Sequence, residues 1–136
     1  MFVPIFFDQY SYILFAFWQV DRGQAYTDAM FQTAGSIFKR ECPSCVTSHK
    51  FIFYKRITAV PSSFSVYNNM KELWSSADNI LNTDFELYSS WNDLQSGMNA
   101  WQYCSFDDTG VAFPGNCQLT VGQTSEQVLP LSTFIF

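Results

Sequence analysis

The chain has 136 residues, of which 48% are hydrophobic and 14% are charged, with a net charge of −5 at pH 7. This composition excludes an intrinsically disordered chain, which combines low hydrophobicity with high net charge, and the length suits one domain with one core. Residues 1–71 hold all seven basic residues and four acidic ones, a charge of +3, whereas residues 72–136 hold eight acidic residues and no basic one. Such an acidic half repels phosphate backbones, so we expect no nucleic-acid partner, and it attracts cations and basic surfaces.

Two helices are predicted within about the first 40 residues. Apolar residues from Val3 to Trp18 follow one stripe of a helix over about 5–20. The rest of that surface is also apolar, so the helix would be buried on several sides or dock on another chain. The longest apolar run is too short for a transmembrane segment. A second stripe predicts a helix to about residue 38, after Asp21 and Gln24 in capping-box spacing.

Strands are expected to dominate from about residue 46 to residue 136. Residues 50–58 are rich in aromatic and β-branched side chains. Apolar residues occupy both odd and even positions, so this segment is predicted to be an interior strand covered on both faces. A helix near 69–81 follows, with Asn69 as its N-cap.

Later in the chain, strands are expected at 84–89, 101–106 and 128–136, around a turn-like segment with the sequence WNDLQSGMN. The prediction for residues 1–136 is a single compact α+β domain, in which two N-terminal helices precede a mostly antiparallel sheet with one further helix.

Four cysteines occur, two of them in a CPSC motif at Cys42 and Cys45 and the others at Cys104 and Cys117. We expect disulfides that join the first pair to the second, which would staple the basic half onto the acidic half and contribute about 2–4 kcal/mol each. Structural disulfides favour an oxidising setting, so an extracellular or luminal, secreted protein is predicted. A zinc site and four free thiols are the alternatives.

The CPSC motif has a second interpretation. Residues 36–45 resemble the part of glutaredoxins in which a strand leads into a CPxC motif. The resemblance implies a thiol-disulfide oxidoreductase with Cys42 as nucleophile, activated by a helix N-terminus, and Cys45 as the resolving thiol. It covers ten residues, since that family continues from the motif into a long helix, whereas a strand pattern begins here at Lys50.

Other catalytic and metal signals are weak, so the chain is predicted to be a binding protein rather than an enzyme. His49 is the only histidine and lacks a nucleophile motif, which favours a packing role. The carboxylates of Asp107 and Asp108 could contribute to a Ca²⁺ site, although EF-hand spacing is absent. No other cofactor is expected.

The acidic half concentrates aromatic residues, which suit a carbohydrate by stacking or a basic protein by charge. The predicted ligand-binding residues flank the turn-like segment and are Trp91, Asn92, Asp93, Asn99 and Trp101. The competing interpretation places both tryptophans in the core. A third possibility is a structural subunit whose apolar first helix docks onto a larger assembly.

Overall fold

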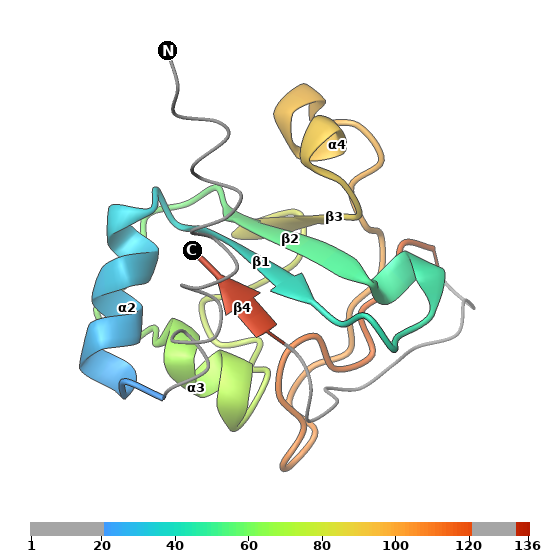
Figure 1. Cartoon of the computed structure of the whole chain (residues 1–136). Helices are drawn as coiled ribbons and strands as arrows, with labels where there is room; N and C mark the ends of the chain where they lie inside the picture. The colour runs from blue at the N-terminus through green and yellow to red at the C-terminus, as the bar shows by residue number, and fades with distance from the viewer. Residues whose placement is uncertain (1–20, 121–132) are drawn as a thin grey trace, which may run out of the picture.

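The computed structural model describes residues 21–120 and 133–136, which form an α+β fold (Figure 1). Its sheet is antiparallel, with the strand order β3-β2-β1-β4. The strands are β1 (Ile37–Glu41), β2 (Phe51–Arg56), β3 (Phe85–Tyr88) and β4 (Thr133–Ile135). The helix expected over about 5–20 and residues 128–132 of the expected last strand lie outside the described residues.

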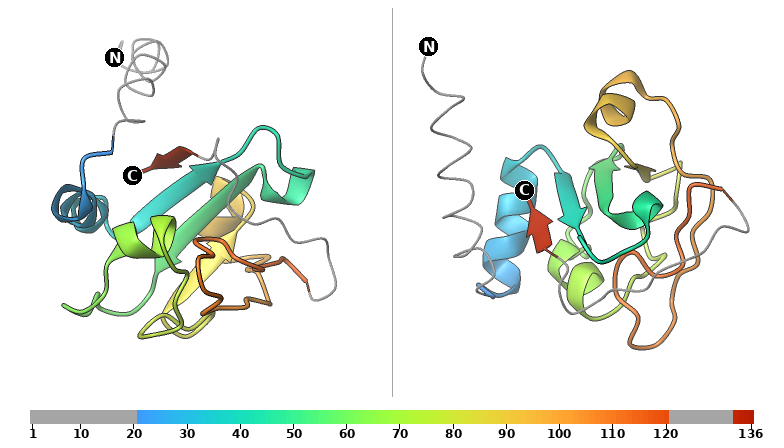
Figure 2. Two further views of the ribbon diagram at one scale, coloured as in Figure 1. Left: turned by 90° about the horizontal axis from the view of Figure 1, so that it is seen from below. Right: turned by 45° about the vertical axis from the view of Figure 1, so that its right-hand side comes forward.

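The helices lie on the two faces of this sheet. They are α2 (Gln24–Thr33), α3 (Val66–Lys71) and α4 (Trp91–Ser96), with a 3₁₀ turn, η1 (Thr47–His49), before β2. Phe31 of α2 contacts Tyr54 of β2, whereas Trp91 of α4 contacts Phe53, the next residue along the same strand. Because successive strand residues point to opposite faces, α2 and α4 cover opposite sides of the sheet, as Figure 2 shows.

The inner face of the sheet, on the side of α2, carries an aromatic core. Tyr54 stacks between Phe38 and Phe85, with ring centroids 4.8 and 4.9 Å away, so one ring from each of β1, β2 and β3 forms a continuous pile. Trp74 and Phe113 meet this pile edge-on. The pile and its neighbours are almost completely buried, so the face against α2, α3 and the segment 100–120 holds the main apolar contacts.

The second predicted helix ends earlier than residue 38, because α2 stops at Thr33. Gly35 and Ser36 adopt positive φ values of 71° and 60°, which a right-handed helix cannot contain. The next residues, from Ile37, then pair with both β2 and β4. Sheet pairing on two sides therefore overrides the helical spacing of the sequence.

The predicted helix near 69–81 is also displaced and shorter, since α3 spans Val66–Lys71. Its N-cap is Ser65, whose hydroxyl accepts a hydrogen bond from the amide of Asn68 at 3.2 Å. Asn69, the expected cap, is buried inside the helix instead. Beyond α3 the backbone of Trp74 bonds to Val111, which directs the chain into a loop.

Two further local expectations were wrong. The segment WNDLQSGMN is not simply a turn, because its first six residues form α4. Residues 101–106 do not form a strand, and only an isolated bridge joins Tyr103 to Gln118. The strand expected at 84–89 is confirmed by β3.

The expected interior strand is confirmed, because β2 pairs with β1 on one side and β3 on the other. The expectation that both of its faces are covered was wrong. Ile52 and Tyr54 are fully buried on the inner face, whereas Phe51 on the opposite face is 48% exposed. The outer side of the strand is therefore partly open to solvent.

The cysteines form two disulfides, but each bridge is local rather than between the halves: Cys42 pairs with Cys45 and Cys104 with Cys117. The first pair closes a tight turn in which the amide of Cys45 bonds to the carbonyl of Cys42. The second pair follows from the bridge between residues 103 and 118, which sets the next two residues inward, 104 and 117, opposite each other. The predicted cross-stapling was wrong because local backbone contacts place the two sulfurs of each pair next to each other.

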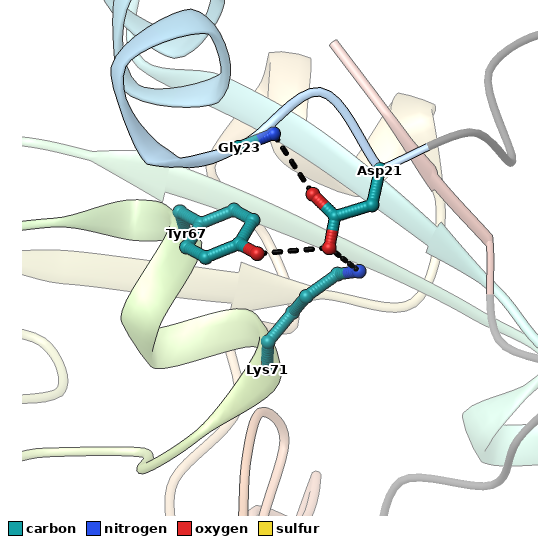
Figure 3. A network of polar contacts seen from close by, with 4 residues as sticks. All are labelled: Asp21, Gly23, Tyr67 and Lys71. Atoms are coloured by element: carbon teal, nitrogen blue, oxygen red, sulfur yellow. Dashed lines mark hydrogen bonds and ion pairs between the residues drawn. The ribbon is translucent and has the colours of Figure 1, made fainter.

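A polar network ties the start of α2 to α3 (Figure 3). One carboxylate oxygen of Asp21 accepts the amide of Gly23 at 2.8 Å, and the other accepts the Tyr67 hydroxyl and the Lys71 ammonium, each at 2.8 Å. The hydrogen bond from Lys71 is the largest cause that lowers the pKa of Asp21 to about 2. The hydrogen bond that Tyr67 donates to Asp21 raises the pKa of Tyr67. Asp21 thus links the segment that precedes α2 to two side chains of α3.

Candidate functional site

The outer face of the sheet is the side that carries α4. Strand alternation and register place these residues on it: Lys39 and Glu41 from β1, Phe51, Phe53 and Lys55 from β2, and Glu86 and Tyr88 from β3. Phe51 is exposed, Phe53 is half-buried and Tyr88 is buried. This face therefore combines aromatic rings with charged side chains at its surface.

Helix α4 begins at Trp91 because Ser90 caps it, accepting the amide of Asp93 on its hydroxyl at 3.0 Å. Gly97 ends the helix with φ 67°, the left-handed conformation that favours glycine at this position. Leu94 is the buried residue of α4, so one apolar side chain anchors the helix to the body. In Figures 1 and 2, α4 lies at the edge of the sheet and projects away from α2 and α3.

Trp91 lies at the base of α4 and remains 47% exposed. Its ring packs against Phe53, with the centroids 6.0 Å apart and the planes inclined by 52°. Helix capping on one side and this ring contact on the other fix the position of an indole that still presents much of its surface to water.

The turn after α4 holds two polar residues in place. Asn99 adopts φ 58°, and its amide nitrogen donates to a carboxylate oxygen of Asp93 at 3.0 Å. Asn92 and Met98 are exposed on the same segment, Met98 at 61%. The structure therefore places Trp91, Asn92, Asp93 and Asn99 on one projecting element, α4 and the turn that follows it.

The second aromatic contribution comes from β2. The ammonium of Lys39 lies 5.8 Å from the centroid of Phe51 and 5.9 Å from that of Phe53, within the range of a cation–π contact. Lys39 also forms an ion pair with Glu41 at 2.5 Å. We call the three rings of Phe51, Phe53 and Trp91 the aromatic platform.

A buried phenol supports the platform from β3. Tyr88 is 1% exposed, and its hydroxyl donates to a carboxylate oxygen of Glu86 at 2.6 Å. Burial, followed by the bond to Glu86, raises the pKa of Tyr88 to about 12. Its neighbour across the strands is Phe53, so a neutral, fixed phenol lies beside the central ring of the platform.

Trp101 lies apart from the other predicted ligand-binding residues, because it is completely buried. Its indole nitrogen donates to the hydroxyl of Ser89 at 2.9 Å, and its ring lies 5.0 Å from that of His49. A ring without an exposed face cannot stack on a ligand, so Trp101 serves the core. Sequence reasoning missed Phe51 and Phe53, although their spacing of two residues would place them on one face of a strand.

The CPSC motif does not present a reactive sulfur. It is followed by the 3₁₀ turn η1 and then β2, so Cys42 does not stand at the N-terminus of an α-helix. Cys42 and Cys45 are 0% and 4% exposed, and the sulfur of Cys45 accepts a hydrogen bond from the buried Arg40 at 3.3 Å. Reactive cysteines of oxidoreductases lie in accessible, electropositive sites, and burial removes the access that this chemistry needs.

Among the described residues, neither candidate calcium residue belongs to a cluster of possible metal ligands. The carboxylate of Asp107 accepts the amide of Ser76 at 3.0 Å and its hydroxyl at 2.5 Å, and these bonds lower the pKa of Asp107. Asp108 is exposed. Within residues 21–120 and 133–136, no three His, Cys, Asp or Glu side chains converge on a possible metal position.

His49 has a structural environment. It is fully buried, with one ring nitrogen 3.0 Å from the carbonyl of Cys117 and the other 2.9 Å from the hydroxyl of Ser48. These contacts join the end of the β1–β2 connection to the second disulfide loop. The histidine therefore links two loops in the described structure.

Comparison with known proteins yields no match to a family model, to a curated protein or to a solved structure. Among the described residues, no helix has both the length and the apolar character needed to cross a membrane.

Proposed function

We propose that this protein is a non-catalytic recognition domain, stabilised by its two disulfides, that binds a carbohydrate or a basic protein partner through α4 and the adjoining turn. One observation carries the proposal: Trp91 is 47% exposed although a helix cap and a ring contact hold it in place. Exposed aromatic rings beside fixed polar groups are typical of sites that bind ligands by stacking and hydrogen bonding.

The polar groups on the same element as Trp91 support a carbohydrate as the ligand. Asp93 and Asn99 are held together at 3.0 Å, so their remaining donors and acceptors are oriented before a ligand arrives. Preorganisation of this kind reduces the entropy lost on binding. A sugar offers hydroxyl groups for these atoms and an apolar ring face for the indole.

We also propose an extracellular or luminal location, without a nucleic-acid partner. Two disulfides in a chain of this size are typical of oxidising compartments. The net charge of −5 opposes binding to phosphate backbones. The competing thiol-disulfide oxidoreductase has less support, because the CPSC sulfurs are buried. A structural subunit that docks through the helix expected over about 5–20 stays a prediction, since those residues lie outside the described part of the chain.

The test is a glycan array and a panel of basic proteins probed with the wild-type domain and with Trp91→Ala. We expect binding to a glycan, and a loss of affinity of more than tenfold in Trp91→Ala, because the stacking surface is removed. Tyr103→Ala is the matched control, since Tyr103 is an aromatic residue 37% exposed on the 100–120 segment. It should bind like the wild type.

The stability of Trp91→Ala separates binding from folding. Because about half of the ring already contacts water, its removal should lower the free energy of unfolding by less than about 3 kcal/mol. Wild-type domain that binds neither glycans nor basic proteins, or a Trp91→Ala variant that binds normally, would overturn the proposal.

A further inference from the structure

We infer that the ligand is a neutral carbohydrate chain longer than one sugar unit, which lies across the aromatic platform formed by Trp91, Phe53 and Phe51. This inference rests on the proposed function and extends the site from α4 onto the outer face of β2. It names the chemical class of the ligand, its minimum size and two residues outside the segment that the sequence indicated.

The size follows from the geometry of the platform. The ring of Trp91 lies 6.0 Å from that of Phe53. Phe51 and Phe53 are two residues apart on one strand, which separates them by about 7 Å along it. Trp91 and Phe51 are 47% and 48% exposed, whereas Phe53 is half-buried. Each exposed ring can stack on one sugar unit, so two exposed rings can hold two units.

The neutral character follows from the charges around the platform. Lys39 pairs with Glu41 at 2.5 Å, and Lys55 lies opposite Glu86 in the register of β2 and β3. The two basic and two acidic side chains of the outer strand face therefore balance, and Asp93 on α4 adds one carboxylate, which accepts a hydrogen bond from Asn99. The acidic excess of the chain lies largely elsewhere, for instance at Asp107 beside Ser76.

A balanced face disfavours strongly charged ligands of either sign. A sulfated or phosphorylated polymer would need unopposed cations, and a polybasic protein would need unopposed carboxylates. The ion pair between Lys39 and Glu41 instead offers ammonium donors and carboxylate acceptors beside the rings. Sugar hydroxyls can use both kinds of group while the ring faces of the sugar pack on Phe51 and Trp91.

The experiment measures affinity against chain length. Isothermal titration with neutral β-1,4-linked oligomers of glucose, N-acetylglucosamine and mannose, from the monosaccharide to the hexasaccharide, should show affinity that rises with length for at least one series. Phe51→Ala should weaken binding of the longest oligomer roughly five- to tenfold, the effect of losing one aromatic contact, and leave the monosaccharide almost unchanged.

Two controls keep the outcomes separate. Ile80→Ala removes a side chain that is 46% exposed but lies outside the outer face, and it should change nothing. Suppose that Trp91→Ala abolishes glycan binding but Phe51→Ala does not affect it for any oligosaccharide length. This result would overturn the inference and leave the proposed function intact. Failure of every carbohydrate would overturn this inference, and failure of the basic proteins as well would overturn the proposed function.

Two other occupants of the platform are also distinguished. Tighter binding of sulfated or uronic-acid oligomers than of neutral ones would overturn the neutral assignment. Sedimentation of the wild type at rising concentration tests a second copy of the chain. Dimerisation that Phe51→Ala abolishes, without glycan binding by the monomer, would show that the platform is a self-association surface and overturn the inference.

Discussion

Replacing the two disulfides one pair at a time tests the local connectivity. The bridges have sequence separations of 3 and 13, and the entropy lost when the unfolded chain is closed into loops of these lengths corresponds to about 2 and about 3 kcal/mol. We therefore expect the free energy of unfolding to fall by about 2 kcal/mol in Cys42→Ala/Cys45→Ala and by about 3 kcal/mol in Cys104→Ala/Cys117→Ala. A bridge between the halves would close at least 59 residues and would be worth about 4 kcal/mol.

Urea unfolding monitored by tryptophan fluorescence gives these free energies, and a non-reducing tryptic digest tests the pairing directly. Trypsin cleaves at Arg40, Lys50 and Lys71 but finds no site beyond Lys71, so one peptide spans 41–50 with Cys42 and Cys45, and another spans 72–136. Local bridges should leave the first peptide unattached and lighter by two hydrogens than its reduced form. A species that joins 41–50 to 72–136 would refute the pairing and the stability argument together.

Two further predictions concern the core and the pH response. Trp101→Ala should lower the free energy of unfolding by about 3–5 kcal/mol in urea titrations, because it empties a fully buried site, and a loss below about 1 kcal/mol would contradict that burial. The pKa of Asp21 is lowered to about 2, so the stability that its contacts with Gly23, Tyr67 and Lys71 contribute is complete above about pH 4 and is lost as the pH falls toward 2. NMR titration of the Asp21 carboxyl carbon should give a midpoint near 2, and a midpoint near 4 would show that the network does not form in solution.

The parts of the fold that the sequence predicted well are those in which local pattern and sheet pairing agree. The aromatic and β-branched residues of 50–58 predicted the strand that is β2, and the strand predicted at 84–89 is β3. The pattern failed at Ile37, where helical spacing continues but pairing with β2 and β4 determines the structure. Spacing alone cannot reveal a partner strand that lies far away in the sequence.

The candidate site was predicted in part for the same reason. The segment around Trp91 was found because aromatic, acidic and amide residues cluster there in sequence. Phe51 was assigned to a covered strand, because its exposure depends on how far α4 extends across the sheet. Trp101 could not be told from Trp91 by residue type, since burial depends on the tertiary contacts with Ser89 and His49.

Each disulfide joins two cysteines that are close in the sequence. Among the described residues, neither disulfide connects the part of the chain before residue 59 to the part after residue 62. The piece up to residue 59 keeps α2, β1 and β2 with one bridge, and the piece from residue 62 keeps α3, β3, α4 and β4 with the other. Strand pairing and the aromatic pile, split between Tyr54 and Phe85, would have to hold two such pieces together. Each piece would thus carry one complete disulfide, and their association would depend on noncovalent contacts alone.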